Sequence, residues 1–200
     1  MVPRANGMLR PMSFEDYKTK ESVVVVYTGE GKGKTSASLG LMIRALGADW
    51  KVAYIQFIKH WKVNEHKFIE KITPTFGDQL YFYKGGAGFY NAGELSAKGI
   101  SDDEHHKMAE ETFQKALACA TSGDYDLVIC DEINNAVHDG LLPIEKLIEL
   151  MEDRHPKTSL CVTGRNFPEE LLEYADIASN MTKLKHHFDN KFLANSGIDF

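Results

Sequence analysis

The chain has 200 residues, of which 43% are hydrophobic and 26% are charged, and this composition predicts one soluble globular domain. Its formal net charge of −6 argues against a nucleic-acid binder or a protein that docks on anionic membranes, since both need a basic surface. No apolar stretch approaches the roughly 20 residues that span a bilayer, and the first residues show no signal-peptide pattern. We therefore predict a cytoplasmic protein.

The cysteines favour the same compartment. Cys119, Cys130 and Cys161 are widely spaced in apolar surroundings, and their spacing is not that of a zinc site. We expect them to be small buried hydrophobes in a reducing environment.

Residues 1–21 differ in pattern from the rest of the chain. They mix Pro3, Gly7 and Pro11 with charges and show no sustained period. We predict an N-terminal arm that becomes ordered only against another surface, and that could cover a site. Residues 22–200 are then expected to form a single domain.

A glycine- and lysine-rich loop follows the first apolar run, residues 23–27. Closely spaced glycines allow a tight turn that aims backbone N–H groups inward, and a helix beginning near Thr35 adds its positive dipole end. The loop therefore predicts a triphosphate site, with Lys34 on the outer phosphates and the Thr35 hydroxyl as a Mg²⁺ ligand. The generic motif has glycine where this chain has Thr28, with Gly29 one place late. The predicted binding residues of the loop are Thr28, Gly29, Glu30, Gly31, Lys32, Gly33, Lys34, Thr35 and Ser36.

Apolar runs of strand length alternate with helical periods along the remaining chain. The expected strands are residues 23–27, 52–58, 80–83, 127–130, 159–162 and 177–181. The expected helices are residues 35–46, 64–72, 101–120, 143–151 and 168–174. This alternation predicts an α/β fold with a mostly parallel six-stranded sheet and helices on both faces.

The long helix begins with a capping box, Ser101 and Glu104, and carries two adjacent histidines. Neighbouring residues on a helix point about 100° apart, so His105 and His106 are expected to be solvated and not to form a metal site.

A second candidate element is the strand 127–130, which runs directly into Asp131 and Glu132. In phosphate-loop proteins this is where the second metal-binding element lies. We predict that Thr35, Asp131 and Glu132 hold Mg²⁺ and that Lys34 acts with them on ATP. Solvated acids at a strand end are the alternative interpretation.

Other polar residues stand at or near predicted strand ends, where open α/β sheets bind ligands: Gln56, Lys59, Asn134 and Arg165. The residues alone do not name the acceptor. Kinases bring several arginines to the phosphoryl group, and this chain has few, which disfavours a small-molecule kinase. A hydrolysing ATPase and a non-catalytic nucleotide carrier remain alternatives. A dinucleotide site is disfavoured because Lys34 stands where the third glycine should be.

Taken together, the motifs resemble the phosphate-loop ATP:corrinoid adenosyltransferases over residues 23–200. The shifted glycine of the loop is shared with that family. The matching blocks are residues 28–35, 56–59, 88–89, 131–134, 163–165, 175–176, 185–186 and 197–200.

The resemblance implies a RecA-like fold, a homodimer, and the substrates MgATP and a corrinoid reduced to Co(I), with a reduced flavodoxin-like electron donor. It implies attack of cobalt on the 5′ carbon of ATP, with triphosphate leaving. Cobalt is then the nucleophile, so a protein base is not expected. Phe89 is the implied aromatic contact of the corrinoid, and Gln56, Lys59, Asn134 and Arg165 become contacts at the site edge. The family's tryptophan position is Asn91 here, and Tyr90 is a candidate to replace the missing ring.

Overall fold

The computed structural model describes residues 17–59, 63–88, 90 and 99–199. Its six strands form one sheet in the order β3-β2-β4-β5-β1-β6, and each neighbouring pair is parallel. The strands are β1 (Val24–Thr28), β2 (Val52–Gln56), β3 (Leu80–Lys84), β4 (Leu127–Asp131), β5 (Ser159–Thr163) and β6 (Ile177–Asn180). The predicted parallel α/β fold is confirmed.

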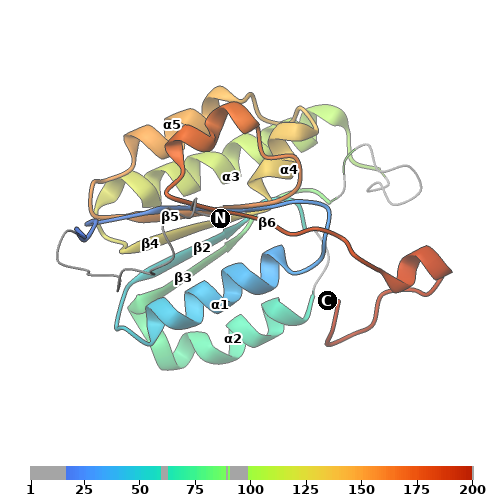
Figure 1. Cartoon of the computed structure of the whole chain (residues 1–200), viewed down its shortest axis with the longest axis horizontal. Coiled ribbons are helices and arrows are strands. Elements are labelled where there is room, and N and C mark those ends of the chain that lie inside the picture. The colour runs from blue at the N-terminus through green and yellow to red at the C-terminus, as the bar shows by residue number, and fades with distance from the viewer. Residues whose placement is uncertain (1–16, 60–62, 89, 91–98, 200) are drawn as a thin grey trace, which may run out of the picture.

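Helices cover both faces of the sheet (Figure 1). One face carries α1 (Lys34–Leu46) and α2 (Asn64–Phe76), and the other carries α3 (Asp102–Ser122), α4 (Ile133–His138) and α5 (Glu145–Asp153). Short 3₁₀ helices are η1 (Gly77–Gln79), η3 (Glu169–Tyr174) and η4 (His187–Asn190). The sequence did not predict α4, and the helix expected over 168–174 is a 3₁₀ helix.

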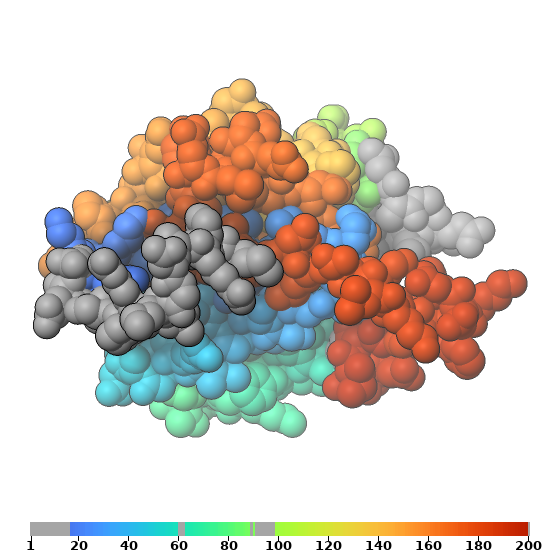
Figure 2. Space-filling model, in the orientation of Figure 1, coloured from blue at the N-terminus to red at the C-terminus, as the bar shows by residue number. Residues whose placement is uncertain are grey.

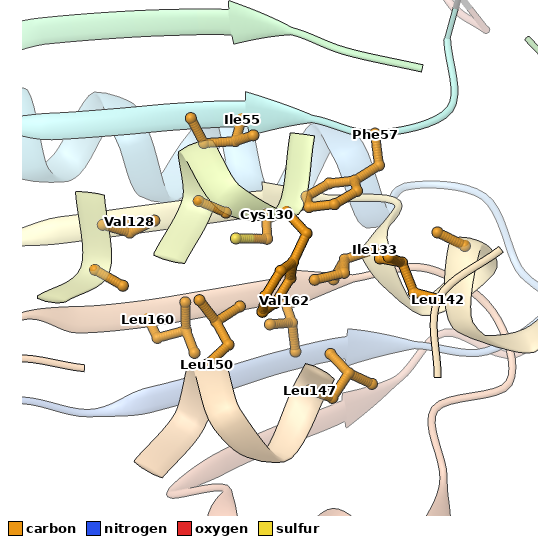
Figure 3. Close-up of a cluster of buried hydrophobic side chains, with 14 of the residues drawn as sticks. Ile55, Phe57, Val128, Cys130, Ile133, Leu142, Leu147, Leu150, Leu160 and Val162 are labelled. Atoms are coloured by element: carbon orange, nitrogen blue, oxygen red, sulfur yellow. The ribbon is translucent and has the colours of Figure 1, made fainter. Parts of the chain in front are cut away.

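The face toward α3 and α5 is a continuous apolar core. Alternate residues of the central strands, such as Ile55, Cys130 and Val162, are fully buried there in one apolar cluster that also includes Leu147 and Leu150 of α5 (Figure 3). Successive strand residues point to opposite faces, so these positions define one side of the sheet only. All three cysteines are buried and unpaired, as predicted.

The face toward α1 and α2 is apolar only until the strands end. Tyr54 and Ile129 belong to the core on this side. Two residues further along the same strands come Gln56 and Asp131, which are register partners and fully buried. Thr163, two residues beyond Cys161 in β5, lies beside them. Carboxyl ends of parallel strands meet at one edge, so the period of two places a row of polar side chains there.

The start of α3 differs in one respect from the expectation. The capping box is present, with the Ser101 hydroxyl accepting from Glu104 N and Ser101 N donating to the Glu104 carboxylate. His106 is exposed as predicted, but His105 is buried, and its ring centroid lies 5.1 Å from that of Tyr90. The prediction of a solvated pair is therefore wrong for His105, because the Tyr90 ring packs against its imidazole.

The segment after β6 extends away from the sheet and bears exposed apolar side chains. Figure 2 shows it as a protrusion at one end of the molecule. Its large exposed apolar side chains are those of Leu184, Phe188, Phe192, Leu193 and Ile198. In the described part of the chain, no helix is both long and apolar enough to cross a membrane.

Candidate nucleotide and metal site

The loop between β1 and α1 owes its shape to its glycines. Gly29 and Gly33 have φ angles of 102° and 111°, in the region that favours glycine. A Cβ atom at Gly29 would lie 2.1 Å from Asn180 Oδ1 and 2.6 Å from the Met181 carbonyl oxygen. Gly31 N donates to the same Met181 carbonyl at 2.6 Å. The end of β6 therefore fixes the loop from one side.

This packing explains why the first glycine stands one place late. Thr28 is the last residue of β1, pairs in register with Asn180, and has no positive φ, so it can carry a side chain. Its hydroxyl accepts from Phe167 N at 3.2 Å. The left-handed turn begins only at Gly29, which is where glycine is needed.

The two predicted catalytic residues of the loop occupy the first turn of α1. Lys34 Nζ donates to the carbonyl oxygens of Gly29 and Gly31, at 2.6 and 2.8 Å, so the lysine folds back across the loop. Burial, followed by the nearby charge of Arg165, lowers the pKa of Lys34. The Thr35 hydroxyl donates to Asp131 Oδ2 at 3.2 Å. The loop and the end of β4 therefore meet through Thr35.

Asp131 is the centre of a buried hydrogen-bond network. Its Oδ2 accepts from Gln56 Nε2 at 3.0 Å as well as from Thr35, and its Oδ1 accepts from the Thr163 hydroxyl at 2.7 Å. Thr163 Oγ1 in turn accepts from Glu132 N at 3.0 Å. These contacts orient the carboxylate from β2, α1 and β5 at once.

Lys59 lies among three carboxylates. Its ammonium is 2.8 Å from Glu65 Oε1 and 3.9 Å from both Asp131 Oδ2 and Glu132 Oε1. Burial opposes the charged form of Lys59, but these acids outweigh it, so its pKa is raised. The cluster holds more carboxylates than ammonium groups, which favours a further cation.

Glu132 has an unusual backbone conformation and a perturbed carboxyl group. Its φ angle is 65°, rare for a residue with a side chain, and it precedes α4. Burial, with added repulsion from Asp131 and Glu65, raises its pKa to about 7 despite the attraction of Lys59 and Lys34. Its Oε2 has no hydrogen-bond partner among the described residues. A buried acceptor of this kind suits a metal ion or a metal-bound water.

The residues therefore fit the Mg²⁺ that the sequence predicts. Mg²⁺ in nucleotide sites is held by one or two carboxylates together with substrate phosphates. Among the described residues no group of three or more His, Cys, Asp or Glu side chains is placed to hold a metal ion. The Thr35 hydroxyl meets Asp131 directly, and Glu132 shares the Lys59 ammonium with Asp131. This arrangement agrees with a metal shared with ATP.

The remaining predicted contacts lie at different depths. Arg165 is at the open edge, 58% exposed, with its guanidinium 3.6 Å from the Glu30 carboxylate. Asn134 is fully buried. Its Nδ2 donates to the Gly164 carbonyl at 3.5 Å, and its Oδ1 has no hydrogen-bond partner among the described residues.

The other predicted residues lie at the surface or outside the described part of the chain. The Lys32 ammonium is 3.4 Å from the Asp199 carboxylate, and Ser36 is exposed. Phe89 and Asn91 lie outside the described residues, whereas Tyr90 packs on His105.

Three residues of the cluster were not predicted as site residues: Thr163, Glu65 and His66. The signal for Thr163 was present, since it continues the alternation of β5 by one polar residue, as Asp131 does in β4. Glu65 and His66 belong to α2, and no local pattern shows that this helix begins beside the end of β2.

Fold and loop together define a phosphate-loop nucleotide-binding protein of the RecA-like type, in which β5 separates the loop strand β1 from the acidic strand β4. A solved structure of the flagellar accessory protein FlaH from Methanocaldococcus jannaschii is similar in fold, with a TM-score of 0.51 and 12% identity over 80% of this chain and 71% of that one.

The chain belongs to the family described as ATP:corrinoid adenosyltransferase BtuR/CobO/CobP, whose model matches residues 20–200. A corrinoid adenosyltransferase of Sinorhizobium sp. is 32% identical over 92% of this chain and 83% of its own length. One from Escherichia coli K12 is 29% identical, covering 90% of this chain and 87% of the relative.

Proposed function

We propose that this protein transfers the 5′-deoxyadenosyl group of MgATP to the Co(I) centre of a corrinoid, releasing triphosphate. The cobalt lone pair forms the Co–C bond, the C5′–O bond breaks, and its electron pair leaves on the triphosphate. The observation that carries the proposal is the meeting of the phosphate loop with Asp131 through Thr35, in a chain of this family. No proton must be removed, which agrees with a site made of cations, amides and oriented acids.

The roles of the residues follow from their positions. Lys34 and the loop amides would stabilise the negative charge that grows on the leaving triphosphate. Thr35, Asp131 and Glu132 would hold Mg²⁺, which supplies charge neutralisation on the phosphates when bound. Lys59 keeps the acids of the site together, and Arg165 lies where it can meet the substrate at the open edge. Gln56 orients Asp131 through a hydrogen bond, and Asn134 supports the backbone at Gly164 by donating to its carbonyl.

One assay tests the proposal against its alternatives. The protein is incubated with MgATP and chemically reduced cobalamin, the cobalt absorption bands are followed, and the phosphate product is identified. We expect an adenosylated corrinoid and triphosphate. ADP with phosphate would show an ATPase or kinase instead, and the absence of any product would show a carrier.

We further infer a homodimer of the chain. The exposed apolar side chains of the tail, among them Phe192 and Leu193, support a second copy of the chain as the surface that buries them. Sedimentation velocity should give twice the mass of one chain. The double variant Phe192→Ser, Leu193→Ser should give a mass closer to that of the monomer. An unchanged mass in that variant would remove the tail from the interface.

The other expectations extend the same proposal. Residues 1–21 would act as an arm over the corrinoid and residues 22–200 as the catalytic domain, so deleting residues 1–20 should weaken corrinoid binding more than ATP binding. Formation of Co(I) requires an external one-electron reductant, for which a reduced flavodoxin-like protein is suitable. The unpaired, buried cysteines support a reducing, cytoplasmic location.

A further inference from the structure

His66 lies directly behind the metal-binding acid of the proposed site. It is the third residue of α2, is 3% exposed, and its ring packs 5.6 Å from that of Phe82 between centroids. Its Nε2 is hydrogen-bonded to Gln56 Oε1. Gln56 is fully buried and bonded to Asp131 through its other end. The three side chains form a chain from α2 to the end of β4.

The proton positions in this chain follow from Asp131. A carboxylate can only accept hydrogen bonds, so the end of Gln56 that faces it must be the NH₂ group. The opposite end is then the amide oxygen, and it requires a donor from His66. Nε2 of the imidazole must therefore carry a proton.

The other ring nitrogen agrees with this assignment. Nδ1 of His66 accepts from Val63 N at 3.3 Å, as a capping side chain at the third position of a helix does. Burial is the largest influence on the ring and lowers the pKa of His66, which favours the neutral imidazole. A neutral ring with Nδ1 accepting has its single proton on Nε2.

We propose that His66 is a positioning residue for the metal site: it fixes the Gln56 amide so that its NH₂ group faces Asp131 and holds that carboxylate toward Thr35. Without the His66 donor, Gln56 can turn its oxygen to Asp131, and the carboxylate loses a hydrogen bond and gains a repulsion. The inference rests on the proposed function, because it assumes that Asp131 serves Mg²⁺ bound with ATP. Partners behind a metal ligand commonly contribute roughly 10- to 100-fold to metal affinity.

The first test is made on the wild-type chain without nucleotide or metal. Nitrogen-15 NMR of the histidine rings reports which nitrogen carries the proton, and His66→Gln assigns the resonance by its disappearance. We expect the proton on Nε2. A proton on Nδ1 would overturn the inference, whether or not any variant folds.

The second test measures ATP affinity in EDTA and again in saturating Mg²⁺, with no corrinoid, so nothing is turned over. The gain in affinity on adding Mg²⁺ should fall roughly 10- to 100-fold in His66→Leu, with affinity in EDTA unchanged. His66→Gln should retain most of the gain, because its amide nitrogen can replace Nε2. Lys67→Ala, an exposed change on the same turn of α2, should match the wild type.

An equal Mg²⁺ gain in His66→Leu and the wild type would overturn the inference, as would a wild type with no gain at all. Both measurements omit the corrinoid. A protein that passes them but releases no triphosphate in the adenosylation assay would contradict the proposed function and leave the role of His66 standing.

Discussion

The two faces of the sheet are built from the same strands but differ in character: one is an apolar core and the other carries the candidate site. Toward α3 and α5, the alternate residues remain apolar to the last position, as in Cys130 and Val162, and they form a dry core. Toward α1 and α2, the same strands end in Gln56, Asp131 and Thr163, all fully buried. On this face the last residue of each of these three strands is polar and not apolar, and this change in residue type turns a packed face into a candidate binding site.

The difference shows how a buried polar site can be kept in a stable domain. An unpaired buried carboxylate is costly, but Asp131 accepts three hydrogen bonds from three separate elements. The opposite face provides the apolar burial that offsets the cost of this network. Changes on the two faces should therefore have separable effects, on chemistry in one case and on stability in the other.

The largest effect should come from Lys34→Ala, on the face that bears the site. Removing a cation that stabilises transition-state charge should lower turnover by about 10³-fold, comparable to loss of an oxyanion-hole donor. Lys34 bonds only to the loop carbonyls in the described structure, so the urea midpoint of unfolding should hardly change. Wild-type turnover and ATP affinity in this variant would contradict the assignment of the loop.

Leu150→Ala makes the matching change on the opposite face. Leu150 is fully buried in α5 against the strands, so the variant should lose about 2 to 5 kcal/mol of unfolding free energy. Turnover per folded molecule should stay near that of the wild type, because Leu150 belongs to the apolar cluster on the face of the sheet opposite Gln56, Asp131 and Thr163. Urea unfolding measures the loss of stability, and an activity assay normalised to the fraction of folded protein measures turnover. A large loss of turnover in fully folded protein would show that the two faces are coupled.

Glu132→Gln tests the cost of keeping the site charged. The native pKa is raised from 4.5 to about 7, so between these values the folded chain binds more protons than the unfolded one. The unfolding free energy of the wild type should therefore fall as pH rises through this window, by about 3 kcal/mol. The variant lacks this dependence and should be more stable than the wild type at pH 8. Equal unfolding free energies of the wild type at pH 5 and pH 8, measured by urea unfolding, would contradict the raised pKa.

A matched pair of loop variants should give a smaller effect. Gly29→Ala places a Cβ atom against Asn180 and the Met181 backbone at a left-handed φ, and we expect ATP affinity to fall about tenfold, since strain of this kind costs of order 1 to 3 kcal/mol. Thr28→Gly restores the generic motif but serves no left-handed turn, so affinity should change little. A gain in affinity from Thr28→Gly would contradict the explanation of the shifted glycine.

The sequence was sufficient for the parts of the molecule that are local in the chain. The loop, its helix, the strand before Asp131 and the capping box at Ser101 each carry their own pattern, and alternation of strands and helices predicted the parallel sheet. The strand order and α4 carry no such signal. The contacts of Lys59 with Glu65, and of His66 with Gln56, depend on where α2 begins in space. The burial of His105 likewise depends on its contact with Tyr90, which no local pattern predicts.

The central claim is that the loop holds a leaving group and does not transfer a phosphoryl group. It is tested most directly with ATP carrying ¹⁸O in the bridge between C5′ and the α-phosphorus, incubated with the protein, Mg²⁺ and Co(I) cobalamin. Cleavage of the C5′–O bond leaves the label in the released triphosphate, so mass spectrometry should find triphosphate two mass units heavier, in equal amount to the adenosylated corrinoid. Label retained on the nucleoside or in ADP would show that a P–O bond breaks instead, and would contradict the account.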